Sequence, residues 1–397
     1  MTGGGHLSFA PHVLTASGGL GERRVALAVT MAAIGLFVAF LALMPAPFPS
    51  FDEWKYFGIG YNLWAGRGLT TVFGSDFLLH GPIWSAIVTL PHVLFGVDSA
   101  AWGRLLNGLA GATIVSLAAW FGWRIRPSVG AFAAVLMVAI VYLHDQSRTA
   151  RLDVPAATFA LLYVALAFES IRRDSTRWAI AAGLAFAIGF LIKEIDLPFA
   201  PIPFLAATLW RVPWVRLVRV TAWSLLVASV GVSWWFVLYG LQNGRFYRLE
   251  SPAWTLIPVA FLIGLLVVAG LALPRLSRSS AADRFAASAW GLRLDRGARL
   301  AVAWGGACVW AAAQLIAYSR TTRLKGGPLL SARQLDLYAD QWIKPFWVAA
   351  LVAAVGIALV PFALAACRSR IERSAVLDLI VAGVCGAPLV ILVIGVG

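Results

Sequence analysis

Three short clusters of polar residues interrupt a chain that is otherwise strongly apolar. The first is Phe51-Asp52-Glu53-Trp54-Lys55-Tyr56, the second runs from His144 to Asp153, and the third is Lys193-Glu194-Ile195-Asp196. A carboxylate in such a cluster can act as a general base, and a nearby arginine or lysine can bind a phosphate. Charged residues beside apolar segments are costly without a partner or a task, so these clusters are the candidates for chemistry.

Each cluster also has a structural interpretation, which the sequence leaves open. The first would be a solvated loop in which Trp54 and Tyr56 anchor the chain at the membrane interface. In the second, Asp153 would be the N-cap of a helix with Pro155 in its first turn. In the third, Lys193 would extend from a helix end toward the lipid headgroups.

The elements that must position these clusters are membrane-spanning helices. Of the 397 residues, 60% are hydrophobic and only 13% are charged, and the mean hydropathy is +0.82. Soluble domains carry roughly a quarter charged residues, so this composition excludes a soluble enzyme and a disordered chain. The apolar segments have the length of bilayer spans and predict an all-α, polytopic transmembrane protein with about eleven spans, at 25–45, 103–123, 129–144, 154–171, 178–192, 197–210, 218–240, 253–273, 300–318, 345–366 and 376–396.

The orientation follows from the distribution of basic residues between alternate loops. With a cytoplasmic N-terminus, the inner segments hold 19 of the 32 basic and seven of the 18 acidic residues, a charge of +12 against +2 outside. This asymmetry obeys the positive-inside bias and accounts for the net charge of +14 without nucleic-acid binding. All three polar clusters then lie on the extracytoplasmic face. The arginine-rich, lysine-poor usage is typical of a bacterial chain, so we expect a multi-pass protein of the bacterial plasma (inner) membrane.

One apolar stretch conflicts with this topology. Residues 81–97 are apolar but contain Pro82, Pro91 and His92, and counting them as a span would place two arginine-rich loops on the outer side. We therefore predict an in-plane or re-entrant helix within a first outer loop at 46–102. The predicted organisation is a cytoplasmic tail at 1–24, a transmembrane module at 25–211 that includes the outer loop and all three polar clusters, and a variable C-terminal transmembrane module at 212–397.

Five segments, taken in order, carry a family resemblance. They are Asp52-Glu53 with the Tyr61–Gly68 segment YNLWAGRG, the His80–Trp84 segment HGPIW with LFG at 94–96, the Ala101–Asn107 segment AWGRLLN, the Arg148–Asp153 segment RTARLD, and GLAFAIGFLIK at 183–193. Over about residues 25–200 the chain resembles the GT-C membrane glycosyltransferases, within them the group of dolichyl-phosphate-mannose–protein mannosyltransferases and lipid A aminoarabinose transferases. It departs from that group at Gly81, where a proline is usual, and at Glu194, where a glycine is usual.

The resemblance implies an inverting glycosyltransferase of GT-C type with juxtamembrane helices in the first outer loop. It implies a polyprenyl-phosphate-linked sugar as donor and a glycan, lipid or protein as acceptor, with transfer on the extracytoplasmic face. A divalent ion is compatible with this family, but we expect no metal and no other cofactor. The sequence does not identify the sugar, which could be a hexose or a pentose, or the acceptor.

The resemblance also implies a role for each site residue. Asp52 would be the general base, and Glu53 and Asp153 would complete the catalytic site. The residues expected to bind substrate are Tyr56, His80, Arg148, Arg151, Lys193 and Glu194. The alternative function is a polytopic transporter or a flippase of lipid-linked glycans. Transporters often carry charge near the membrane midplane, whereas the acidic residues of this chain gather at the predicted outer ends.

Overall fold

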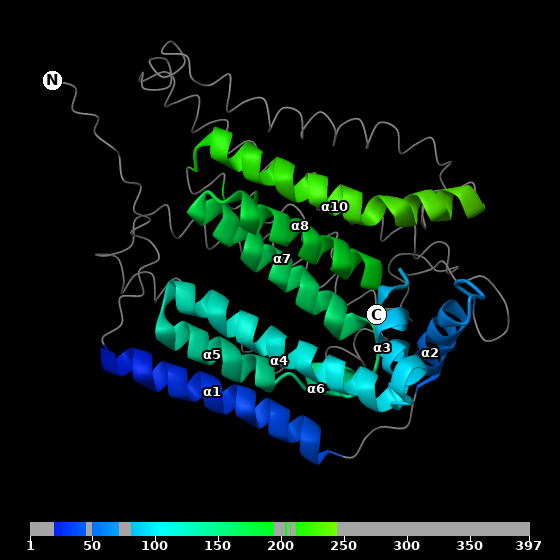
Figure 1. Ribbon diagram of the computed structural model, residues 1–397. Helices are drawn as coiled ribbons and strands as arrows, with labels where there is room; N and C mark the ends of the chain where they lie inside the picture. Colours follow the sequence, from blue (N-terminus) through cyan, green and yellow to red (C-terminus); the bar gives the residue numbers. More distant parts are fainter. Residues whose placement is uncertain are drawn as a thin grey trace, which may run out of the picture. The chain divides into compact units, whose positions relative to one another are not determined.

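The computed structural model describes residues 20–44, 50–70, 81–193, 203–204, 207 and 212–243. These residues form helices and no β-strand. The helices, labelled as in Figure 1, are α1 (Leu20–Leu43), α2 (Phe51–Trp64), α3 (Ile83–Phe95), α4 (Ser99–Ile125), α5 (Pro127–Val138), α6 (Val141–Ser147), α7 (Asp153–Arg173), α8 (Thr176–Ile192) and α10 (Trp214–Asn243). All of them belong to one of the two compact units of the chain.

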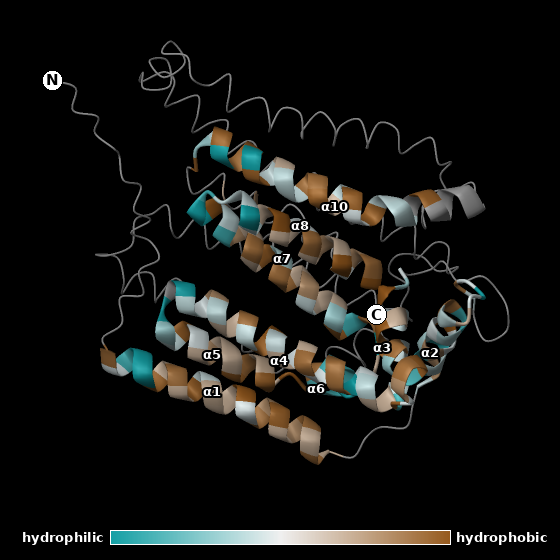
Figure 2. Ribbon diagram, viewed as in Figure 1, coloured by the Kyte–Doolittle hydropathy of each residue, from teal (hydrophilic) through white to brown (hydrophobic). Residues whose placement is uncertain are grey.

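Four of these helices are long and apolar enough to cross a membrane, namely α1, α4, α7 and α10. Figure 2 shows hydrophobic residues along much of these helices, with the strongly hydrophilic residues near the ends where α4 meets α5 and α7 meets α8. The prediction of a polytopic helical membrane protein is confirmed. The later predicted spans, at 253–273, 300–318, 345–366 and 376–396, and most of 197–210 lie outside the described residues. The division into modules at 25–211 and 212–397 stays a prediction.

The long helices pack in the order α1, α5, α4, α7, α8 and α10 (Figure 1). Small residues allow the close contacts in this series, as is usual for helices in membranes. Gly130 of α5 lies so close to Trp123 of α4 that an added Cβ would stand 1.8 Å from the indole ring. Between α8 and α10, the Ser224 hydroxyl donates a hydrogen bond to the Ala179 carbonyl oxygen at 3.0 Å.

Ion pairs join the helix ends on one side of this bundle. Glu22 at the start of α1 pairs with Arg126 in the turn between α4 and α5, with Oε1 and Nε 2.7 Å apart. Glu169 near the end of α7 pairs with Arg124 near the end of α4. Asp174, in the turn between α7 and α8, pairs with Arg219 of α10. These contacts gather the arginine-rich turns at one end of the bundle, opposite α2 and α3 (Figure 1), as the loop charges predicted.

The predicted span at 129–144 is wrong as a single helix. Helix α5 ends at Val138, and a separate short helix, α6, begins at Val141. The imidazole of His144 explains the break, because its Nε2 forms a hydrogen bond of 2.6 Å with the Val138 carbonyl oxygen. This contact satisfies a carbonyl group that has no partner where a helix ends. The ring of His144 in turn packs against Phe37 and Phe40 of α1.

The first outer loop contains helices, as expected. Helix α3 has 13 residues, which extend about 20 Å and fall short of a hydrocarbon core of about 30 Å. It packs against α2, α4 and α8, and Pro91 is accommodated within it. The short length favours the predicted in-plane or re-entrant helix over a span.

Candidate functional site

The site is built first from the N-terminus of α2. Ser50 is the N-cap, and its backbone N–H donates to Glu53 Oε2 at 2.6 Å, while the Glu53 N–H donates to Ser50 Oγ at 3.4 Å. This reciprocal pair is a capping box. Successive residues of a helix point about 100° apart, so Asp52 and Glu53 face different directions. Glu53 is completely buried, whereas Asp52 is exposed.

The buried carboxylate of Glu53 joins three segments that are distant in the sequence. Besides the bond from Ser50, its Oε1 accepts the Ala150 N–H at 2.8 Å and the Arg104 Nε–H at 3.4 Å. Arg104 belongs to α4, and Ala150 lies in the segment between α6 and α7. With both oxygens occupied by donors, Glu53 is suited to positioning the helix that carries Asp52, rather than to accepting a proton.

A residue that the sequence analysis did not single out holds the second polar cluster. Asn107 of α4 is fully buried, and its Nδ2 donates to the carbonyl oxygen of Arg151 at 3.0 Å and lies within hydrogen-bond distance of the carbonyl oxygens of Gln146 and Thr149. One amide thus fixes the backbone of residues 146–151. A polar residue within an apolar span is costly unless it has partners, and this signal could have identified Asn107 from the sequence.

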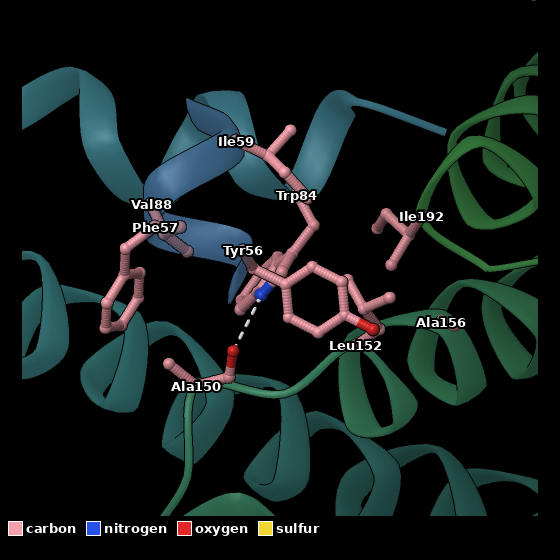
Figure 3. Packing of buried hydrophobic residues seen from close by; sticks show 9 residues of the cluster. All are labelled: Tyr56, Phe57, Ile59, Trp84, Val88, Ala150, Leu152, Ala156 and Ile192. Carbon is pink, nitrogen blue, oxygen red and sulfur yellow. Dashed lines mark hydrogen bonds between the residues drawn. The ribbon is translucent and has the colours of Figure 1, made fainter. Parts of the chain in front are cut away.

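A shared hydrophobic cluster holds α2, α3, α7 and the end of α8 together (Figure 3). Its buried members are Tyr56, Phe57, Ile59, Trp84, Val88, Ala150, Leu152, Ala156 and Ile192. The indole Nε1–H of Trp84 donates to the Ala150 carbonyl oxygen at 2.9 Å, the bond drawn in Figure 3. Tyr56, one of the expected substrate-binding residues, is therefore part of the packed cluster, with 8% of its surface exposed.

Asp153 and Lys193 form an ion pair beside this hydrophobic cluster, where α7 begins and α8 ends. Lys193 Nζ lies 2.5 Å from Asp153 Oδ1, and the two side chains are 13% and 29% exposed, respectively. Asp153 is the first residue of α7, and Lys193 directly follows α8. The N-cap interpretation of Asp153 is wrong, because Leu152 occupies the N-cap and no side chain caps the helix. The Asp153 carboxylate binds the lysine instead.

The unusual Gly81 has a steric explanation. A Cβ at this position would stand 2.1 Å from the carbonyl oxygen of Leu191, a distance that no side chain tolerates. The backbone that leads into α3 therefore runs directly against the last turn of α8, two residues before Lys193. A proline, usual in the resembled family, also carries a Cβ and does not fit here.

Of the remaining residues expected to bind substrate, two arginines lie in the described structure and two other residues do not. Arg148 and Arg151 are half-buried in the segment that Asn107 and Glu53 hold. Arg151 Nε is buried and has no hydrogen-bond partner within the described residues. His80 and Glu194 lie outside those residues. Among the described residues, no group of three or more His, Cys, Asp or Glu side chains could hold a metal ion.

The fold and these contacts define a multi-pass helical membrane protein with acidic and basic side chains organised at one end of its helices. Residues 79–236 match the family of dolichyl-phosphate-mannose-protein mannosyltransferases. The resemblance inferred from the motifs is thus confirmed over this segment, which begins after Asp52 and Glu53 and contains Arg148, Arg151, Asp153 and Lys193.

Two curated relatives match part of the chain. A polyprenol-phosphate-mannose–protein mannosyltransferase of Mycolicibacterium smegmatis (strain ATCC 700084 / mc(2)155) is 30% identical over 159 residues, which make up 40% of this chain and 30% of the relative. The corresponding protein of strain MKD8 gives the same values. The chain thus matches less than a third of the length of these relatives.

The crystal structure of ArnT from Cupriavidus metallidurans bound to undecaprenyl phosphate is also similar to this chain. The two share 18% identity, with a TM-score of 0.44, over 95% of this chain and 70% of ArnT.

Proposed function

We propose that the chain is an inverting glycosyltransferase that moves a sugar from a polyprenyl-phosphate-linked donor to an acceptor hydroxyl. The observation that carries this proposal is the difference in burial between the adjacent acids Asp52 and Glu53. Glu53 is buried and binds three backbone or side-chain donors, and this leaves the exposed Asp52 at the first turn of α2 for chemistry. The family match at 79–236 supports the choice of reaction.

In the proposed reaction, Asp52 accepts the proton of the acceptor hydroxyl. The hydroxyl oxygen forms a new bond to C1 of the sugar, while the bond between C1 and the phosphate oxygen breaks and its electron pair leaves with the polyprenyl phosphate. A single displacement inverts the anomeric centre and needs no covalent enzyme intermediate. No cofactor is part of this proposal.

The departing phosphate requires positive charge that strengthens its contacts as the bond breaks. Lys193 supplies an ammonium group, and its pairing with Asp153 at 2.5 Å keeps that group at the end of α8. Arg151 adds a guanidinium whose buried Nε lacks a partner within the described residues. The common cluster under α2, α7 and α8 supports a single site for Asp52 and this pair.

We place this site on the extracytoplasmic face of the bacterial plasma membrane, with the N-terminus in the cytoplasm. At the opposite end, the described residues include nine arginines and three acids, namely Arg23, Arg24, Arg124, Arg126, Arg172, Arg173, Arg177, Arg216 and Arg219 with Glu22, Glu169 and Asp174. Among the described residues, the charges at the site end are nearly balanced. The positive-inside bias then favours a cytoplasmic location for the arginine-rich end.

A comparison of cells with and without this protein tests the function and identifies the acceptor. We expect mass spectrometry of cell-envelope glycans to show one glycosylation that is lost without the protein. Cells that produce Asp52→Asn at the wild-type level should lack the same glycan. Full restoration by Asp52→Asn, or unchanged glycans in cells without the protein, would contradict the proposal.

A further inference from the structure

Three arginines converge on one buried carboxylate at the end of the bundle opposite the candidate site. Glu169, in the last two turns of α7, has a side chain only 8% exposed. Its Oε2 accepts Arg172 Nη2 at 2.6 Å and Arg173 Nε at 2.8 Å, and its Oε1 contacts Arg124 Nη2 from α4. We refer to Arg124, Glu169, Arg172 and Arg173 as the Glu169 cluster.

The Glu169 cluster carries more positive charge and more donors than its carboxylate can satisfy. Three guanidinium groups against one carboxylate leave a charge of +2. Each guanidinium has five N–H donors, whereas a carboxylate offers about four lone-pair sites. The arginine side chains are 30%, 38% and 51% exposed for Arg124, Arg172 and Arg173. The surplus donors are therefore accessible to an anion.

Two tryptophans hold the outer guanidinium groups in place. The Arg124 guanidinium lies over the Trp120 ring, 4.5 Å from its centroid, and the Arg173 guanidinium lies 5.2 Å from the Trp178 ring centroid. Such cation–π contacts favour fixed guanidinium planes. Since the Glu169 carboxylate also contacts each of the three arginines, the guanidinium groups are held in position before any anion binds.

The position of the Glu169 cluster determines which anions can reach it. Helices α4 and α7 are both candidate membrane spans, and the cluster occupies their adjacent ends. The ends of spanning helices lie at the depth of the lipid headgroups. Basic sites between helices at this depth bind the headgroups of anionic lipids, and arginine matches phosphate with paired N–H groups.

We propose that the Glu169 cluster binds the phosphodiester headgroup of an anionic phospholipid in the leaflet at this end of the helices. The inference concerns lipid binding and does not depend on the transfer reaction. The pair of Glu22 and Arg126 at the same end provides a matched control, since one acid neutralises one arginine within the pair.

The test is the binding of phosphatidylglycerol and phosphatidylcholine to the purified full chain, measured by native mass spectrometry. We expect the wild type to prefer phosphatidylglycerol and the affinity to fall about fivefold for each arginine removed in Arg124→Gln and Arg173→Gln. Arg126→Gln should bind as the wild type does. Equal binding of both lipids by the wild type, or an unchanged preference in both arginine variants, would overturn the proposal.

A variant with the opposite effect separates lipid binding from structural damage. In Glu169→Gln the charge of the cluster rises from +2 to +3, while the amide oxygen still accepts hydrogen bonds from the arginines and the two tryptophans still contact Arg124 and Arg173. Phosphatidylglycerol should therefore bind more tightly than to the wild type. Loss of folding cannot produce tighter binding, and a weaker or unchanged affinity in a folded Glu169→Gln protein would contradict the proposal. Displacement of the lipid by millimolar inorganic phosphate would also contradict it, by assigning the cluster to a soluble anion.

Discussion

The replacement Glu53→Gln tests the division of labour between the two adjacent acids. Glutamine has almost the same shape as glutamate but keeps only one acceptor oxygen. In the folded protein, three donors converge on the Glu53 carboxylate, from Ser50, Ala150 and Arg104. The new amide NH₂ would face one of these donors, and the Arg104 guanidinium would lose its contact with a negative charge.

The cost follows from burial. Removing one partner of a buried ion pair costs about 3–5 kcal/mol. Since the Arg104 side chain is 18% exposed, water relieves part of this penalty, and we expect Glu53→Gln to lower the free energy of unfolding by about 2–4 kcal/mol. Asp52→Asn should leave that free energy nearly unchanged, because Asp52 is exposed and makes no hydrogen bond or ion pair in the described structure.

The assay is unfolding of both purified variants in detergent, followed by tryptophan fluorescence. Limited proteolysis should in parallel show faster cleavage near residues 146–152 in Glu53→Gln, since Ala150 loses its acceptor. A Glu53→Gln protein as stable as the wild type, or an Asp52→Asn protein destabilised to the same degree, would refute the assignment of Glu53 to positioning.

Four further predictions concern the reaction. Asp52→Asn should reduce the rate of sugar transfer by about 10²–10⁴-fold, which is the contribution of general-base assistance. The rate is measured on protein whose unfolding curve matches that of the wild type. Asn107→Leu leaves buried carbonyl groups without their hydrogen-bond donor and should lower the free energy of unfolding by about 1–3 kcal/mol. Steady-state kinetics should show a raised KM for the polyprenyl-phosphate-linked sugar. Lys193→Met should weaken the binding of polyprenyl phosphate, measured by a binding titration, and Asp153→Asn should weaken it less. If both variants lost the same affinity, Lys193 would not be the residue that binds the phosphate. Dialysis against EDTA should leave the transfer rate unchanged, and restoration of lost activity by Mg²⁺ or Mn²⁺ would introduce a metal into the account.

The features predicted well from the sequence depend on composition and on charge at helix ends. Apolar length predicted α1, α4, α7, α8 and α10, and the arginine distribution predicted which turns share an end. The same charges favoured an in-plane or re-entrant helix at 81–97 over a span, and the 13 residues of α3 agree with that preference. Apolar length and loop charge are properties of short segments, so they can be predicted without knowing how the helices pack.

The features that were missed arise from contacts between distant residues. The break after Val138 depends on the ring of His144, and the task of Asp153 depends on Lys193, forty positions away. The opposite burial of Asp52 and Glu53 had a local signal, since Ser50 and Glu53 have the spacing of a capping box. The partners of Glu53 on α4 and at Ala150 become visible only when the helices are packed.

The most direct test of the central claim is transfer by the purified full chain. The protein is incubated with polyprenyl-phosphate-linked sugars, and the release of polyprenyl phosphate is measured together with the appearance of the sugar on an acceptor. We predict that at least one donor is consumed with matching release of polyprenyl phosphate and inversion at C1, and that Asp52→Asn slows both by about 10²–10⁴-fold. A folded protein that moves intact lipid-linked sugars across liposome membranes without transferring them would contradict the account.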